Sequence, residues 1–384
     1  MEKIMLLIAI FFLQSCSVIM DNSQVSYKEI ETLKSEKKVT YEKMFYKKGW
    51  KDSIQYTTKE YDVTYQNGNS YLIAKNIGEN RLIGYELNTQ EKIFEIPPNK
   101  LSFPIEQGEV ASVYVHNFDS IFIAQTYQLT LLDSTGNIKS QIPLNDGSSK
   151  YALGNLHGDS PVFYDSRMES LYFQTYCWKC PQHKTSYYTS HVSSSLNLKT
   201  KEVQALPISY PMSYQENYYG FANHVYGTYT DSLNIYTFPM TPNIYLYNRY
   251  TKDYQELGGK SEYQKQSPYA LSRQQKDDDK AKIEHFNRAT LYYKVHYDPF
   301  RKYYYRFFSP ALPEKNEDGL FTKYSDRDHI LMIFDEQFKL IDEIKLEGKH
   351  QVFFTFCTPK GLYVSRIDEK EGKGLYTIFK IDIQ

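Results

Sequence analysis

A short hairpin pattern recurs along the chain, and it limits the folds that the chain can adopt. In each copy an aromatic strand ends in a polar turn, and an aromatic or aliphatic strand follows a few residues later. The turns lie 46 to 67 residues apart, at Asn67, Asp119, Asp165, Asp231, Asp298 and Thr358. Each interval is long enough for one four-stranded antiparallel sheet with its loops. The repeat therefore predicts six similar sheets.

A second hairpin follows each of the first five turns, so five units have four strands each. The second hairpins span residues 83–96, 129–142, 192–206, 244–257 and 331–344. The last unit reaches Gln384 with only three strands, and residues 25–33 are expected to supply the fourth. Pairing the two ends of a chain removes the last open edge of a ring of sheets. We therefore predict an all-β fold, a six-bladed β-propeller closed by an N-terminal strand.

Two other architectures fit the same pattern. A seven-bladed propeller fits if residues 39–60 or 260–327 contain a further irregular sheet. A pair of β-sandwiches would show similar turns locally. The propeller prediction assigns residues 25–384 to one domain, with insertions near 258–287 and 309–328.

The composition excludes several classes of protein. The chain has 384 residues with 45 Lys and Arg against 46 Asp and Glu, so no excess of charge favours nucleic acid as a partner. Its 38 Tyr and 22 Phe are typical of strands. A mean hydropathy of -0.60 together with so many aromatic rings excludes both a polytopic membrane protein and a disordered chain.

The first sixteen residues have the pattern of an export signal. A charged start precedes an unbroken apolar run, Ile4–Leu13, and Cys16 follows shortly after it. Ten helical residues extend only about 15 Å, which is too short to span a membrane. The segment from Leu13 to Cys16 resembles the lipobox of bacterial lipoproteins, although Gln14 stands where a small residue is preferred. The resemblance implies a signal peptide over residues 1–15, a lipidated Cys16 and a tether over 16–24; the alternative is an ordinary secretory signal.

Together, the lipobox and the Tyr-rich repeat resemble the uncharacterised β-propeller lipoproteins of Bacteroidota, a family with a domain of unknown function. This resemblance covers the leader and the whole repeat region, and it implies a fold and a location but no reaction. Residues 17–24 lack the acidic cluster associated with export to the cell surface. We therefore expect an outer-membrane lipoprotein that faces the periplasm.

The remaining cysteines fit an oxidising compartment. Cys177 and Cys180 form a CxxC motif, for which we expect a structural disulfide. A redox pair and half of a metal site with His183 remain alternatives. The sequence has no second CxxC or HxxxH motif to complete a zinc site, so no metal or other cofactor is predicted. Cys357 follows an apolar run and is expected to be a buried free thiol.

A ligand site is expected where the loops that lead into the inner strands meet the loops between the second and third strands of each blade. Two of these loops are rich in tyrosine. The candidate ligand-binding residues are Tyr176, Trp178, Tyr214, Tyr218 and Tyr219. Such rings suit recognition of a peptide or a sugar, but the same rings can also pack one blade against the next.

Histidine and carboxylate groups are the weaker candidates for catalysis. His157 and Asp159 lie together in one of these loops and could act as an acid–base pair, and His224 is a further candidate. His224, His116 and His296 all fall on predicted inner strands. The sequence contains none of the GxSxG, HExxH, GxxxxGK[ST] or GxGxxG motifs.

These observations predict a lipid-anchored, monomeric binding or scaffold module of the cell envelope, whose partner is a protein, a peptide or a glycan. One alternative is a glycan-processing hydrolase or lyase on the same scaffold. Another is a metal-linked or redox-linked sensor built on Cys177, Cys180 and His183.

Overall fold

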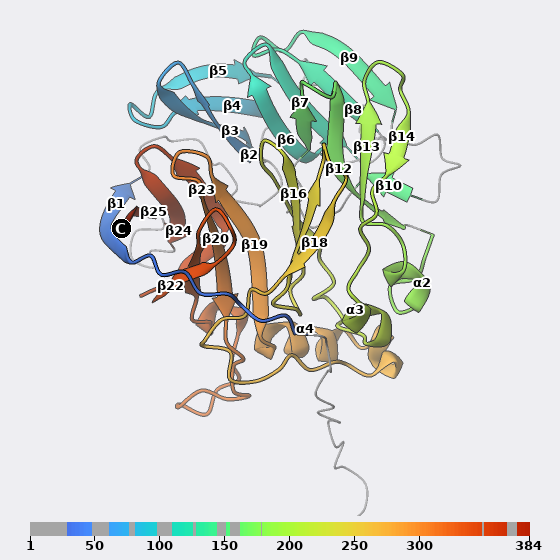
Figure 1. Cartoon of the computed structure of the whole chain (residues 1–384), viewed down its shortest axis with the longest axis vertical. Helices are drawn as coiled ribbons and strands as arrows, with labels where there is room; N and C mark the ends of the chain where they lie inside the picture. The colour runs from blue at the N-terminus through green and yellow to red at the C-terminus, as the bar shows by residue number, and fades with distance from the viewer. Residues whose placement is uncertain are drawn as a thin grey trace, which may run out of the picture.

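Six antiparallel sheets surround a central axis in the computed structural model (Figure 1). The structure describes residues 29–47, 61–76, 81–97, 110–125, 128–143, 151–153, 162–177, 179–347, 349–366 and 375–384. Each sheet is one blade, so the predicted six-bladed propeller is confirmed. Residues 39–47, which were considered for a seventh blade, belong instead to the sixth.

The first three blades occupy the N-terminal half of the chain. Blade 1 contains β2 (Tyr61–Gln66), β3 (Asn69–Asn76), β4 (Arg81–Glu86) and β5 (Lys92–Ile96). Blade 2 contains β6 (Val110–Asn117), β7 (Ser120–Gln125), β8 (Gln128–Leu132) and β9 (Ile138–Pro143). Blade 3 contains β11 (Phe163–Asp165), β12 (Ser170–Cys177), β13 (Ser193–Asn197) and β14 (Val203–Ala205), and the short β10 (Tyr151–Leu153) also pairs with β12.

The other three blades complete the ring. Blade 4 contains β15 (Tyr226–Tyr229), β16 (Leu233–Thr237), β17 (Ile244–Asn248) and β18 (Tyr254–Leu257). Blade 5 contains β19 (Leu291–Asp298), β20 (Tyr303–Ser309), β21 (Ile330–Phe334) and β22 (Leu340–Lys345). Blade 6 contains β23 (His350–Thr358), β24 (Gly361–Arg366), β25 (Leu375–Ile383) and β1 (Val39–Lys47).

An N-terminal strand closes the ring, but it is β1 and not residues 25–33. β1 pairs antiparallel with β25 from Val39 opposite Ile383 to Lys47 opposite Leu375. Residues 29–33, the described part of the predicted strand, lie against blades 4 and 5 instead, where the Leu33 carbonyl accepts a hydrogen bond from the Leu340 amide at 2.8 Å. β1 is rich in β-branched and aromatic residues, whereas residues 25–33 alternate only loosely, so β1 is the better strand.

Side-chain acceptors organise the turns that follow the inner strands. Asp165 Oδ1 and Asp298 Oδ1 each accept a hydrogen bond at 3.0 Å from the amide two residues ahead, as the sequence predicts for turn-forming aspartates. The same turn in blades 2 and 4 uses Asn117 and Thr230, which lie one or two positions before the predicted aspartates. The turn chemistry is therefore repeated, while the residue that supplies it varies.

The long loops gather at one end of the propeller, which we call the insertion face. It carries the helices α2 (Thr185–Tyr188), α3 (Met212–Glu216) and α4 (Asp279–Arg288), and the 3-10 turns η2 (Arg273–Asp277) and η3 (Tyr324–Asp326). Figure 1 shows α3 and α4 near the bottom of the molecule and α2 at its lower right. The opposite end, formed by the turns that follow the inner strands, we call the turn face. None of the helices in the described ranges is long and apolar enough to cross a membrane.

Candidate functional site

A cavity of about 360 Å³ lies on the axis of the propeller, and all six blades contribute to its wall. Its lining comes mainly from the inner strands β2, β6, β11, β15, β19 and β23 and from the turns that follow β15 and β19. Because those turns belong to the turn face, the cavity lies toward that end of the channel. A site on the axis is physically favoured, since the ring brings side chains from distant parts of the sequence to one point.

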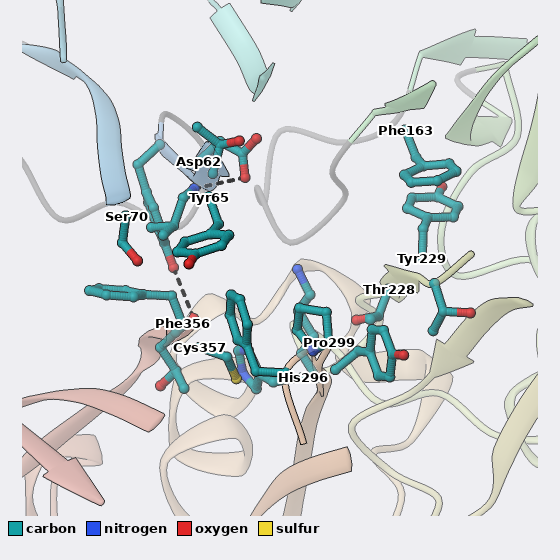
Figure 2. A pocket seen from close by; sticks show the side chains of 18 of the residues that line it. Asp62, Tyr65, Ser70, Phe163, Thr228, Tyr229, His296, Pro299, Phe356 and Cys357 are labelled. Atoms are coloured by element: carbon teal, nitrogen blue, oxygen red, sulfur yellow. Dashed lines mark hydrogen bonds between the residues drawn. The ribbon is translucent and has the colours of Figure 1, made fainter. Parts of the chain in front are cut away.

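Seven aromatic rings line this axial cavity: those of Tyr61, Tyr65, Phe163, Tyr229, Tyr297, Phe300 and Phe356. On one side Phe163 stacks on Tyr229 from the next blade, with ring centroids 5.4 Å apart (Figure 2). Tyr65 and Phe300, from blades 1 and 5, meet edge to face at 5.1 Å, and both are more than a third exposed. The wall therefore offers rigid ring faces to a ligand.

Two carboxylates line the cavity, the exposed Asp231 and the more deeply held Asp62. The Oδ2 atom of Asp62 accepts a hydrogen bond from the Val115 amide of blade 2 at 2.6 Å, and its Oδ1 accepts one from the Val63 amide at 2.8 Å. Burial nevertheless raises the pKa of Asp62 to about 6, because the two amides and the nearby Lys294 only partly offset the lost solvation. Asp62 therefore changes its charge close to neutral pH.

His296 of blade 5 and Cys357 of blade 6 add two neutral polar groups to the wall. Burial, with a smaller effect from the charge of Lys294, lowers the pKa of His296 to about 3, so the ring is uncharged at physiological pH. Burial and the charge of Asp298 raise the pKa of the Cys357 thiol well above its usual value. Cys357 therefore stays protonated and is a poor nucleophile.

A buried arginine braces one side of the cavity. The Arg249 side chain is fully buried, and it donates to Asp165 Oδ2 at 3.2 Å, to the Leu233 carbonyl at 2.9 Å and to Asn234 Oδ1 at 2.8 Å. Its guanidinium also lies 4.7 Å from the centre of the Phe163 ring. Blade 4 thereby holds a cavity residue of blade 3 in place, which preorganises the wall for binding.

The comparisons with known proteins agree with this architecture. A family model described as a domain of unknown function (DUF4221) matches residues 50–345. The chain belongs to the DUF4221 family. None of the curated proteins is a significant match.

Two solved structures share the propeller of this DUF4221 protein. The crystal structure of a family member from Bacteroides vulgatus has a TM-score of 0.71 and 21% sequence identity, and the match covers 93% of this chain and 99% of that one. A putative exported protein from Bacteroides fragilis has a TM-score of 0.50 and 11% identity, with 89% and 95% of the two chains covered. At these identities the likeness shows the fold alone.

The tyrosines chosen from the sequence lie in the core of the DUF4221 domain under the insertion face. Tyr214, Tyr218 and Tyr219 are all buried. The Tyr214 hydroxyl donates to the Ala222 carbonyl at 3.0 Å and accepts from the Met240 amide at 2.9 Å. These side chains make the tightly packed interior of the insertion face, so we place no ligand on them. Their spacing in the sequence did not distinguish core packing from ligand contact.

The other sequence candidates are not brought together. Tyr176 is half-buried in β12, and His224 lies just before β15, not on it, with its ring near Tyr226 and Phe286 at 6.2 Å from each. Three further candidates and the lipidation site lie outside the described residues: His157, Asp159, Trp178 and Cys16. The inner-strand positions of His116 and His296 agree with the sequence prediction.

The CxxC motif forms a disulfide between Cys177 and Cys180, whose Cα atoms are 5.3 Å apart. It lies at the end of β12, before α2, and both half-cystines are buried. Within the described ranges no group of three or more His, Cys, Asp or Glu side chains could hold a metal ion.

The axial cavity was missed from the sequence for a specific reason. The sequence signal for the cavity was the presence of polar residues on inner strands, such as Asp62 in β2 and Lys294 in β19. The side chains of an inner strand face either a neighbouring blade or the channel, so a polar side chain there indicates the channel. The prediction placed the site at the insertion face instead, because the loops there are long and rich in tyrosine. The described lining of the cavity is closer to the turn face, whose loops are short.

Proposed function

We propose that this DUF4221 protein is a binding module of the bacterial cell envelope that takes part of a glycan or peptide ligand into its axial cavity. The observation that carries the proposal is the wall of the cavity, which combines seven aromatic rings with two carboxylates, one lysine and several hydroxyl groups. Rings of this kind stack on sugar rings and on peptide side chains, while the few polar groups fix orientation. The volume of about 360 Å³ accommodates one sugar ring or one large side chain, so most of a longer ligand would remain outside.

The proposed location is the outer membrane, with the domain facing the periplasm and held by acyl chains on Cys16. The support is the apolar run followed by Cys16 in the sequence, together with the exported neighbour from Bacteroides fragilis. Each buried methylene contributes about 0.8 kcal/mol, so several acyl chains hold a folded domain at a membrane without a spanning helix.

The binding proposal is tested by calorimetry with short peptides and fragments of envelope glycan. For any ligand that binds, Tyr65→Ala at the mouth of the cavity should weaken affinity by about tenfold, which corresponds to the loss of one ring contact of about 1 kcal/mol or more. Tyr254→Ala is the matched control, because Tyr254 is 49% exposed on an outer strand and Tyr65 is 46% exposed. Equal weakening by both variants, or none by Tyr65→Ala, contradicts a ligand in this cavity.

The anchor has its own test. Radiolabelled fatty acid should enter the wild-type protein and not Cys16→Ser. Equal labelling of the two proteins would refute the anchor and leave the binding proposal standing.

A glycan-processing enzyme is a second candidate, and one observation favours it. A carboxyl group in a cavity with a pKa of about 6 is poised to act as a general acid or base near neutral pH. Turnover of envelope glycans that is lost in Asp62→Asn but kept in His224→Ala would support this candidate. Binding without turnover in the wild type would refute it.

A further inference from the structure

The insertion face exposes large apolar side chains that the fold does not use. Met212 in α3 is 65% exposed and Ile283 in α4 is 51% exposed. In the loops beside them, Phe221 is 39% exposed, and Leu320 and Phe321 are each 65% exposed. Single exposed apolar residues are common on any protein, but a group on one face indicates a surface that something covers.

Three of these side chains lie on α4 or directly beside it. On one side, the Lys282 ammonium of α4 lies over the Phe221 ring at 4.9 Å. On the other side, Phe321 lines a cavity of about 270 Å³ together with Glu284 and Arg288 of α4. Ile283 projects from the exposed surface of the helix between them. The apolar side chains therefore belong to one patch centred on α4.

The described chain begins at this same end of the molecule. Glu29 pairs with Lys260 at 2.8 Å, and the Lys260 amide donates to Thr32 Oγ1 at 2.7 Å. Lys260 belongs to the loop that continues into α4, and Figure 1 shows the blue N-terminal trace running from β1 toward α4. Cys16 is 13 residues before Glu29, so the chain between them reaches at most about 45 Å.

We propose that the insertion face rests on the lipid surface in which Cys16 is anchored, with the apolar patch around α4 entering the interface. This inference rests on the anchor proposed above. A tether that starts on the insertion face brings that face to the membrane first, and exposed Phe, Leu, Ile and Met side chains are the groups that enter a headgroup region favourably. The axial cavity, at the turn face, then points away from the membrane toward ligands in the periplasm.

The charged residues around the patch suit contact with a lipid surface. Lys280 of α4 has an exposed side chain that can lay its methylenes on the interface while its ammonium group reaches the headgroups, whereas Lys282 is mostly covered and pairs with Asp279. Acidic neighbours such as Asp279 and Glu284 keep the patch close to neutral overall. The contact is therefore expected to depend on apolar insertion more than on salt concentration.

An environment-sensitive fluorophore distinguishes the two faces. The full-length lipidated protein is labelled under non-reducing conditions through Phe321→Cys or Ile283→Cys, and the labelled protein is reconstituted into vesicles of phosphatidylethanolamine and phosphatidylglycerol. Tyr65→Cys on the turn face is the control, because Tyr65 is also exposed. Labelled wild type measures any background from Cys357.

We expect the probes at residues 321 and 283 to shift to the blue on vesicles and to be quenched by lipids that carry a nitroxide, while the probe at residue 65 does neither. Vesicle flotation of every protein is measured in parallel. Flotation without quenching at residues 321 and 283 overturns the docked face and leaves the anchor intact. Failure of the wild type to float overturns the anchor, and the docked face with it. A blue-shifted probe at residue 321 without vesicles shows that another copy or a protein covers the patch, which also overturns the inference.

Discussion

The titration of Asp62 leads to a quantitative prediction about stability. The ordinary pKa of 3.8 applies to the unfolded chain, and burial raises the pKa of Asp62 to about 6 in the folded domain. As pH rises, the unfolded state releases this proton first, so the folded state is favoured at low pH and loses stability as pH passes from about 4 to about 6. A shift of about two units corresponds to about 3 kcal/mol.

The perturbation that isolates this effect is Asp62→Asn. The amide oxygen can accept one of the two backbone hydrogen bonds but not both, which costs about 1–3 kcal/mol at every pH. The variant has no charge to bury, so its unfolding free energy should change less between pH 4 and pH 7. The wild type should lose up to about 3 kcal/mol more than the variant over that range.

The assay is urea unfolding of Cys16→Ser protein, with and without Asp62→Asn, at several pH values. Other titrating groups, such as His296, are present in both proteins and cancel in the difference. Parallel curves for the two proteins would refute the burial argument for Asp62.

A ligand with a cationic group next to Asp62 should bind more tightly above pH 6 than below it, because only the ionised carboxylate attracts it.

Three further predictions concern the framework of the cavity. Arg249→Met should destabilise the domain by about 3–5 kcal/mol, since it removes the buried cation that pairs with the Asp165 carboxylate and leaves that carboxylate only neutral donors such as the Tyr250 hydroxyl, and adding Asp165→Asn should recover part of the loss; urea unfolding measures both. A chain that starts at residue 48 lacks β1 and should lose its cooperative unfolding transition in calorimetry, whereas a chain that starts at residue 29 should keep it. Replacing both Cys177 and Cys180 by Ser should lower the unfolding free energy by only about 2 kcal/mol, because the disulfide closes a short loop; a much larger loss would show that the bridge organises α2 as well.

The closing strand shows how far a pattern in the sequence can be used. The requirement for a fourth strand in blade 6 follows from counting strands, and the N-terminal source of that strand was predicted correctly. The choice between residues 25–33 and residues 39–47 was wrong, because both segments alternate and only the pairing with β25 selects one of them. Register is determined by the partner strand, which lies at the other end of the chain.

The tyrosines of the insertion face show where a local sequence pattern is not enough. Tyr214 of α3 and Tyr219 lie in the long connection between β14 and β15, where exposed rings usually indicate a binding surface. In the structure they pack against other rings, with Tyr214 and Tyr219 centroids 4.7 Å apart. A loop long enough to fold back on itself makes its own interior, and a local pattern does not reveal which rings that interior will bury.

The sequence by itself determined the features that depend on neighbouring residues. These are the six repeated units, the polar turns with their side-chain acceptors, and the strands that alternate between them, because period and turn chemistry act over a few residues. Only the tertiary structure decided which N-terminal segment closes the ring, which tyrosines are buried and which end of the channel holds the cavity. Those features join residues as far apart as Asp62 and His296, and the position of such pairs depends on how six blades pack around one axis.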